Sequence, residues 1–101
     1  MKRVLLPLAL VTSTATPAWA DLALATNKNC MTCHSMEKKV IGPAYKEVAA
    51  KYKNDKGATD TLAAKIRAGG VGVWGQIPMP ANAQVNDADA KRLAAWILQQ
   101  K

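Results

Sequence analysis

The chain has no phenylalanine, a single histidine and only two cysteines among its 101 residues. The histidine and both cysteines fall within one five-residue segment, Cys30 to His34. A structural zinc site normally takes four protein ligands, so the chain is poorly supplied for one. No run alternates apolar and polar residues, which argues against strands, and no internal repeat is evident. These absences indicate a small chain without sheets and with few side chains that could bind a metal.

The segment Cys30-Met31-Thr32-Cys33-His34 has the form C-x-x-C-H, which is the attachment sequence of a c-type haem. Each thiol can add across a haem vinyl group, and the two intervening residues place both sulfurs along one edge of the porphyrin. His34 follows directly, which places its imidazole under the iron as the proximal ligand. The alternatives are a zinc site or a redox-active cysteine pair. A redox pair usually sits beside a strand in a βαβ unit, and the sequence predicts no such unit.

The first twenty residues have the features of a secretory signal peptide. Lys2 and Arg3 form a basic start, an apolar run follows over residues 4–11, and Ala18-Trp19-Ala20 is an A-x-A cleavage site. A membrane anchor is the alternative, but it needs about 20 apolar residues, and this run is shorter and contains Pro7. We therefore expect residues 1–20 to be removed and residues 21–101 to form one soluble, monomeric domain in the periplasm, without a membrane anchor.

The chain is basic, with 14 Lys and Arg against seven Asp and Glu and a formal net charge of +7. Binding to nucleic acid is one interpretation of such a balance, but export argues against it. Long-range attraction to an acidic protein surface is a better one, because it speeds encounter and weakens with salt. Solvation of helix faces is the alternative role for many of these lysines.

Two helices are predicted in the first half of the mature chain. One runs from Leu22 to about Cys30 with Asp21 as its N-cap, and it carries the C-x-x-C-H segment at its C-terminal end. The next starts at Pro43, whose fixed φ suits a first turn. Its apolar face follows from residues at helical spacing: Tyr45, Val48, Ala49 and Tyr52.

Two more helices are predicted in the second half. One runs from about Thr59 to Ala68, with Thr59 or Asp60 as the cap and Gly69 after its end. The last begins after Asn86, with Asp89 at the third helical position in a near capping box. The fold class expected is therefore all-α, with about four short helices.

A long connection, residues 69–85, is rich in Gly and Pro and has no helical period. A loop of this length in a small domain is usually functional. Residues 70–75 fit G-x-G-x-x-G, but a dinucleotide site needs a strand before this motif and a helix after it. Here a helix precedes it and Pro78 follows, so we expect the glycines instead to let the backbone pass close to the haem edge.

A second axial ligand can be sought by elimination, because the chain has no second histidine and methionine or lysine must therefore be considered. Met1 leaves with the signal peptide, Met31 lies inside the attachment segment, and Met36 follows His34 so closely that it stays on the proximal side. Met79 remains, between Pro78 and Pro80, whose restricted backbones can hold a thioether in place. A lone methionine is more often core filling, but the upstream haem motif favours ligation here.

The chain resembles the short bacterial class I cytochromes c, the cytochrome c-551 (cytochrome c8) group, over essentially the whole mature sequence. The motifs that carry the resemblance occur in order: Cys30–His34, Gly42-Pro43-Ala44-Tyr45, Gly72-Val73-Trp74-Gly75 and Ile77-Pro78-Met79-Pro80. The resemblance implies the class I cytochrome c fold around one covalent haem c. It implies thioethers at Cys30 and Cys33 and axial ligation by His34 and Met79.

Four further roles are implied by the resemblance alone. The Pro43 carbonyl accepts a hydrogen bond from His34, Trp74 donates to a haem propionate, Lys65 pairs with a propionate, and Asn82 orients near the Met79 sulfur. The alternatives are a core role for Trp74, a surface role for Lys65 and a turn role for Asn82. The chain departs from many relatives at two places, which hold Ala25 instead of an aromatic residue and Asn29 instead of glycine.

The function implied is that of a one-electron carrier and not of an enzyme. In relatives the acceptors are a nitrite reductase, cytochrome c peroxidase or a terminal oxidase, and the donor is a quinol-oxidising complex. A haem sensor or peroxidase-like enzyme with an open sixth site is the alternative, and a haem-free C-x-x-C module is a third interpretation.

Overall fold

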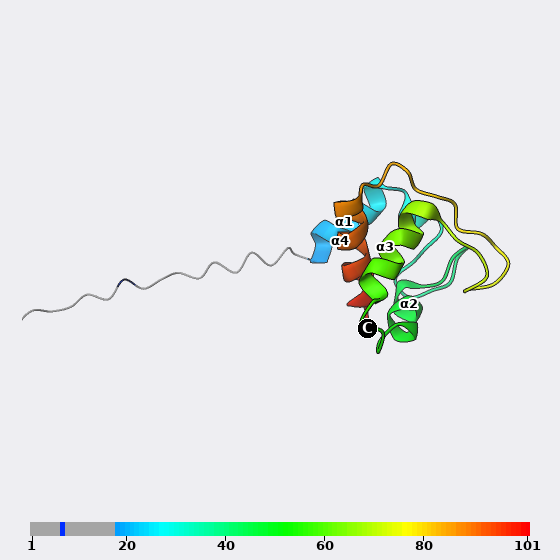
Figure 1. Ribbon diagram of the computed structural model, residues 1–101, viewed down its shortest axis with the longest axis horizontal. Helices are drawn as coiled ribbons and strands as arrows, with labels where there is room; N and C mark the ends of the chain where they lie inside the picture. Colours follow the sequence, from blue (N-terminus) through cyan, green and yellow to red (C-terminus); the bar gives the residue numbers. More distant parts are fainter. Residues whose placement is uncertain (1–6, 8–17) are drawn as a thin grey trace, which may run out of the picture.

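The computed structural model describes Pro7 and residues 18–101. It contains four α-helices, α1 (Ala18–Asn27), α2 (Tyr45–Lys51), α3 (Ala58–Ala68) and α4 (Asp87–Leu98), and a 3₁₀ turn, η1 (Cys30–Thr32) (Figure 1). Among the described residues there are no strands, only two isolated bridges, His34 with Lys39 and Gly70 with Met79. The prediction of an all-α fold with about four helices is confirmed. Most of the signal segment expected at 1–20 lies outside the described residues.

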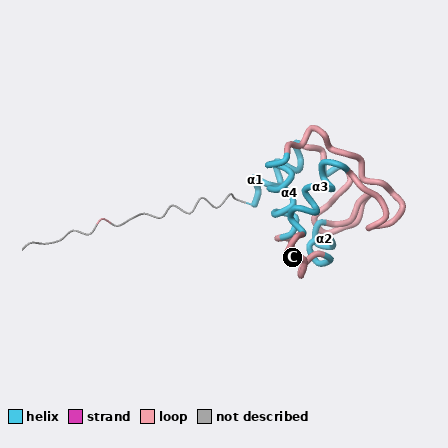
Figure 2. The backbone as a smooth tube through the Cα atoms, viewed as in Figure 1, coloured by secondary structure: helices cyan, strands magenta, loops and turns pink. Residues whose placement is uncertain are grey.

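Helix α4 is the centre of the packing, because α1, α2 and α3 all contact it. The side of α4 that faces the other helices is apolar and buried, with Leu93 1% exposed and Ala94 fully buried. Figure 2 shows the helices gathered on one side and two long loops, residues 28–44 and residues 69–86, extending from the other. The core is formed by α4 together with residues from the other helices and one loop residue: Ala25, Tyr45, Val48, Leu62, Ala63, Ile66 and Val85.

The first helix differs from its prediction. It begins at Ala18, so Asp21 lies in its first turn and is not its N-cap. The Asp21 carboxylate instead accepts a hydrogen bond from Nε of Arg92 on α4, an ion pair that ties the two terminal helices together. The helix ends at Asn27, short of Cys30, because Asn29 adopts a left-handed conformation with φ 66° and the chain turns into η1.

The next two helices begin elsewhere than predicted. Helix α2 starts at Tyr45 with the extended residue Ala44 before it, not at Pro43. Helix α3 starts at Ala58 after Gly57, whose backbone N–H donates to the Asp55 carboxylate at 2.9 Å. This Asx-type turn uses a short polar side chain to close the backbone, and the cap falls at Gly57, ahead of Thr59 and Asp60.

The later boundaries follow the predicted caps. Gly69 terminates α3 with φ 75°, a conformation that favours glycine. The side chain of Asn86 accepts from the Asp89 backbone N–H at 2.8 Å and so caps α4. Helix ends set by local hydrogen bonds of this kind are therefore predictable from the sequence.

Candidate cofactor site

One apolar cavity of about 250 Å³ lies between the C-x-x-C-H segment and the long loop. A single water takes up about 30 Å³ of liquid, so this space is much larger than a packing defect. Its floor is made by core residues of α3 and α4, and its walls by the two long loops. The residues that matter for the site are Cys30, Cys33, His34, Tyr45, Lys65, Trp74 and Met79, and the floor residues are Leu62, Ile66, Leu93 and Ile97.

The turn η1 presents both cysteines to this cavity. Backbone N–H groups of Cys33 and His34 donate to the Cys30 carbonyl at 3.2 and 3.1 Å, which closes the turn over two intervening residues. Both thiols are free and partly exposed. Burial raises the pKa of the Cys30 thiol, chiefly by desolvation. The local turn therefore presents both thiols to the same cavity.

His34 is oriented by the backbone that follows it. Its Nδ1 lies 2.8 Å from the Pro43 carbonyl oxygen, which can only accept, so Nδ1 carries the hydrogen. The Nε2 lone pair then remains available for a ligand bond. Gly42 makes this approach possible, because a Cβ there would lie 2.5 Å from Cε1 of His34. The Gly42 N–H also donates to the Cys33 carbonyl at 2.7 Å, which holds the two segments together.

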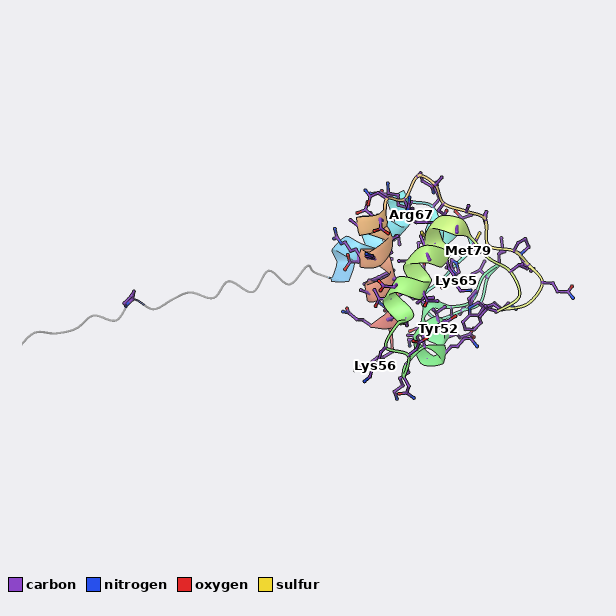
Figure 3. The ribbon with its side chains drawn as sticks, in the orientation of Figure 1. Tyr52, Lys56, Lys65, Arg67 and Met79 are labelled. Carbon is purple, nitrogen blue, oxygen red and sulfur yellow. The ribbon has the colours of Figure 1, made fainter. Side chains whose placement is uncertain are left out.

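Met79 lines the same cavity from the long loop, beside the C-terminal end of α3 (Figure 3). Its backbone exchanges two hydrogen bonds with Gly70, Met79 N–H to Gly70 carbonyl at 2.8 Å and the reverse at 3.1 Å. Gly69 packs so tightly here that a Cβ would lie 2.5 Å from the Met79 carbonyl oxygen. The loop is thus closed at its base, and Met79 stands at that base.

Of the four residues that the resemblance alone points to, the structure places three at the cavity or its rim. Pro43 contacts His34 as described, and Trp74 and Lys65 both line the cavity. Trp74 is 39% exposed, and Nζ of Lys51 lies 5.5 Å from its ring centroid.

Asn82 lies at the loop base, and its amide is engaged by backbone. It donates to the Ile66 carbonyl at 3.0 Å and to the Pro80 carbonyl at 3.3 Å, and its oxygen accepts from Gln84. Both amide hydrogens are used in this way. Asn82 therefore connects the loop that carries Met79 to α3.

Two neighbours of the site were not identified from the sequence. The Tyr45 ring stacks on His34, with centroids 5.2 Å apart and planes 20° apart. Burial raises the pKa of the Tyr45 phenol far above its ordinary value, so the ring is neutral. Arg67 donates through Nε to the Val85 carbonyl at 3.1 Å and secures the end of the long loop. Helical spacing indicates a core role for Tyr45, and no sequence signal pairs it with His34.

The donor set suits a covalently attached haem. Two free thiols, an imidazole with its Nε2 available and a thioether all border one apolar space large enough to need filling. In the part of the chain that the structure describes, no three His, Cys, Asp or Glu side chains gather to hold a bare metal ion. The arrangement therefore fits a flat apolar cofactor with an axially ligated metal better than a zinc ion.

The sequence model of one protein family, described as Cytochrome c, matches residues 22–101. Cytochrome c-551 of Allochromatium vinosum is 58% identical over 84 residues, 83% of this chain and 89% of that protein. Cytochrome c-551 of Pseudomonas aeruginosa is 50% identical over 96 residues, 93% of this chain and 91% of that protein. The crystal structure of cytochrome c552 from Nitrosomonas europaea superposes with a TM-score of 0.78 at 56% identity, covering 79% of this chain and 99% of that one.

None of the helices among residues 18–101 is both long and apolar enough to cross a membrane.

Proposed function

The chain belongs to the cytochrome c family and is a small class I electron carrier with a covalent haem c, and from this premise we propose that His34 and Met79 hold the iron. Cys30 and Cys33 form the two thioethers. The observation that carries this assignment is the single apolar cavity bordered by both thiols, the imidazole and the Met79 side chain. When bound, the haem supplies a one-electron iron couple, which Met/His ligation shifts toward a higher potential than His/His ligation.

The protein residues have distinct tasks in this proposal. Pro43 accepts from Nδ1 of His34, which fixes the imidazole tautomer and raises the basicity of Nε2. Trp74 and Lys65, at the cavity, provide an N–H donor and a cation for the haem carboxylates. Asn82 braces the Met79 loop against α3 through its bonds to the Ile66 and Pro80 carbonyls, and we propose that it orients the thioether through the position of this loop. With His34 and Met79 both bound, the iron would have no free position for substrate, and the protein would pass electrons instead of acting as an enzyme.

The test is spectroscopic. The ferric protein should show the far-red charge-transfer absorption that reports a Met–iron bond, and the reduced protein should resist carbon monoxide. An absent band together with ready carbon monoxide binding would instead support a sensor or peroxidase-like protein with an open sixth site. Haem retained on a denaturing gel tests the thioethers separately and distinguishes this protein from a haem-free C-x-x-C module.

We further propose that the carrier works in the periplasm as a monomer and meets redox partners through their acidic surfaces. The supporting features are the signal-like residues 1–20 and the positive net charge, which is +7 for the whole sequence and falls to +5 when Lys2 and Arg3 leave with residues 1–20. The candidate acceptors are a nitrite reductase, cytochrome c peroxidase and a terminal oxidase, and the candidate donor is a quinol-oxidising complex.

Two measurements test these points. Determining the N-terminal residue of the periplasmic protein should give Asp21, and another start would shift the boundary between residues 1–20 and 21–101. Rates of reduction or oxidation with each candidate partner should fall as ionic strength rises, because screening weakens attraction between opposite charges. Rates that do not change with salt would contradict an electrostatic docking surface.

A further inference from the structure

Tyr45 lies against the face of the His34 imidazole. It is the first residue of α2 and is 2% exposed, and its ring is nearly parallel to the imidazole at a centroid distance of 5.2 Å. Offset or near-parallel aromatic pairs at such distances are favourable beyond their buried area. The contact therefore gives the imidazole a preferred plane.

Other contacts restrain the remaining motions of the same ring. The Nδ1 hydrogen bond to Pro43 at 2.8 Å restrains rotation of the imidazole about its bond to Cβ. Gly42 packs so closely against the imidazole that a Cβ at this position would lie 2.5 Å from Cε1 of His34. Tyr45 adds a flat surface that opposes tilting. Together these contacts leave the ring little freedom within its pocket.

Tyr45 is itself held by the core. Its ring meets Trp96 of α4 edge to face, with centroids 5.4 Å apart and planes 70° apart, and Trp96 is only 3% exposed. Its backbone N–H donates to the Ser35 carbonyl at 2.9 Å, next to His34 in the chain. The rings of His34, Tyr45 and Trp96 therefore contact one another in sequence, and Tyr45 links the imidazole to helix α4.

We propose that Tyr45 is a positioning residue that sets the plane of the His34 imidazole, and that Trp96 transmits the position of α4 to it. This inference rests on the proposed role of His34 as an axial ligand. The plane of an imidazole ligand decides which metal d orbitals it overlaps by π donation. Its orientation is therefore visible in the magnetic properties of the ferric protein, and a general loss of stability would not imitate that effect.

The test compares ferric holoprotein variants by the paramagnetic shifts of the four haem methyl groups and by the low-spin electron paramagnetic resonance signal. Tyr45→Phe keeps the flat ring and should retain the pattern of the unaltered protein. Tyr45→Leu removes it and should change the order or spread of the methyl shifts. Tyr52→Leu, at the C-terminal end of the same helix, is the matched control and should leave the pattern unchanged.

Three results would overturn the inference. Tyr45→Leu with an unchanged shift pattern would make Tyr45 ordinary core packing, even if the variant melts at a lower temperature. Equal changes in Tyr45→Leu and Tyr52→Leu would remove its specificity. If Tyr45→Leu fails to fold, nuclear Overhauser contacts in the unaltered reduced holoprotein decide the matter, because contacts between the two rings support the stack and their absence refutes it.

Failure of this inference and failure of the proposed ligation look different. If His34 and Met79 are not the ligands, the unaltered protein lacks the far-red band. If only the role of Tyr45 is wrong, the unaltered protein keeps that band and the Tyr45 substitutions leave the magnetic pattern intact.

Discussion

Nζ of Lys51, in the last turn of α2, lies 5.5 Å from the centroid of the Trp74 ring in the long loop. A lysine ammonium within about 6 Å of an indole face is attracted by the ring quadrupole. The contact joins a helix end to a loop that is otherwise exposed at this point, as Val71 and Val73 on the same loop show. It holds Trp74 at the rim of the cavity.

We expect the Lys51–Trp74 pair to contribute about 0.5–1 kcal/mol, the range for exposed cation–π contacts. A double-mutant cycle with Lys51→Met and Trp74→Leu, measured by denaturant unfolding of the holoprotein, should give a coupling energy of this size. Lys53→Met combined with Trp74→Leu is the control and should be additive. Additivity in both cycles would show that the Lys51–Trp74 contact does not contribute to the free energy of unfolding.

Met79→Ala should open the site to external ligands and lower the reduction potential, because the thioether that favours the ferrous state is lost. The haem should stay attached, since Cys30 and Cys33 are unaltered. Spectra with and without added imidazole or carbon monoxide, and a redox titration, measure the change. A variant that keeps the original potential and far-red band would contradict the assignment of Met79.

Gly69→Ala should displace the Met79 backbone. Gly69 has φ 75°, and a Cβ there would lie 2.5 Å from the Met79 carbonyl oxygen. Backbone strain of this kind costs about 1–3 kcal/mol, and the clash adds to it. We expect lower stability in urea and a weakened far-red band.

Gly72→Ala is the matched control for this substitution. Gly72 has φ 100°, but no atom of the described residues outside its own neighbours lies within 4 Å of the added Cβ. It should lose stability through backbone strain and keep the far-red band. Equal effects of the two substitutions on the band would mean that the Gly69–Met79 contact does not position the thioether.

Gly42→Ala should disturb His34 directly, because the new methyl group would lie 2.5 Å from Cε1 and 2.9 Å from Nδ1. The hydrogen bond to Pro43 should lengthen, and the haem-methyl shifts of the ferric protein should change. Gly57→Ala is the comparison, since its Cβ would meet only the Asp55 carboxylate at 3.6 Å. An unchanged shift pattern in Gly42→Ala would show that the loop moves aside without cost to the imidazole.

Arg92→Gln should destabilise the protein by about 1 kcal/mol, because hydrogen bonds to charged groups are among the stronger ones and the Asp21 side chain is only 13% exposed. Solvent around Arg92, 42% exposed, limits the effect. Lys91→Gln removes the exposed pair with Asp87 on the same helix and should cost less than about 0.5 kcal/mol. Urea unfolding of both variants measures the difference. Equal losses in the free energy of unfolding would show that the Asp21–Arg92 pair contributes no more than an exposed surface pair.

Local signals predicted most of the helices but not all of their ends. Asn86 and Gly69 act through bonds to residues a few positions away, so their roles could be inferred from spacing alone. Asp21 has the same chemistry as a capping residue, yet it pairs with Arg92 from the far end of the chain. Asp21 still lies in the first turn of α1, but its partner is set by a long-range ion pair, which no spacing rule contains.

The chemistry of the site was contained in the residue types and their order. C-x-x-C-H indicates haem attachment because two thiols and an imidazole must follow one another at one turn, and the scarcity of other donors makes Met79 the proposed second ligand. These conclusions need only the spacing of the side chains along the chain and the number of donor atoms that they supply. The positions of Tyr45 over His34 and of Asn82 against α3 depend on how α2, α3 and the long loop pack around α4. Such contacts join segments distant in sequence, so they arise from the collective burial of apolar surface and are set only when the whole core closes.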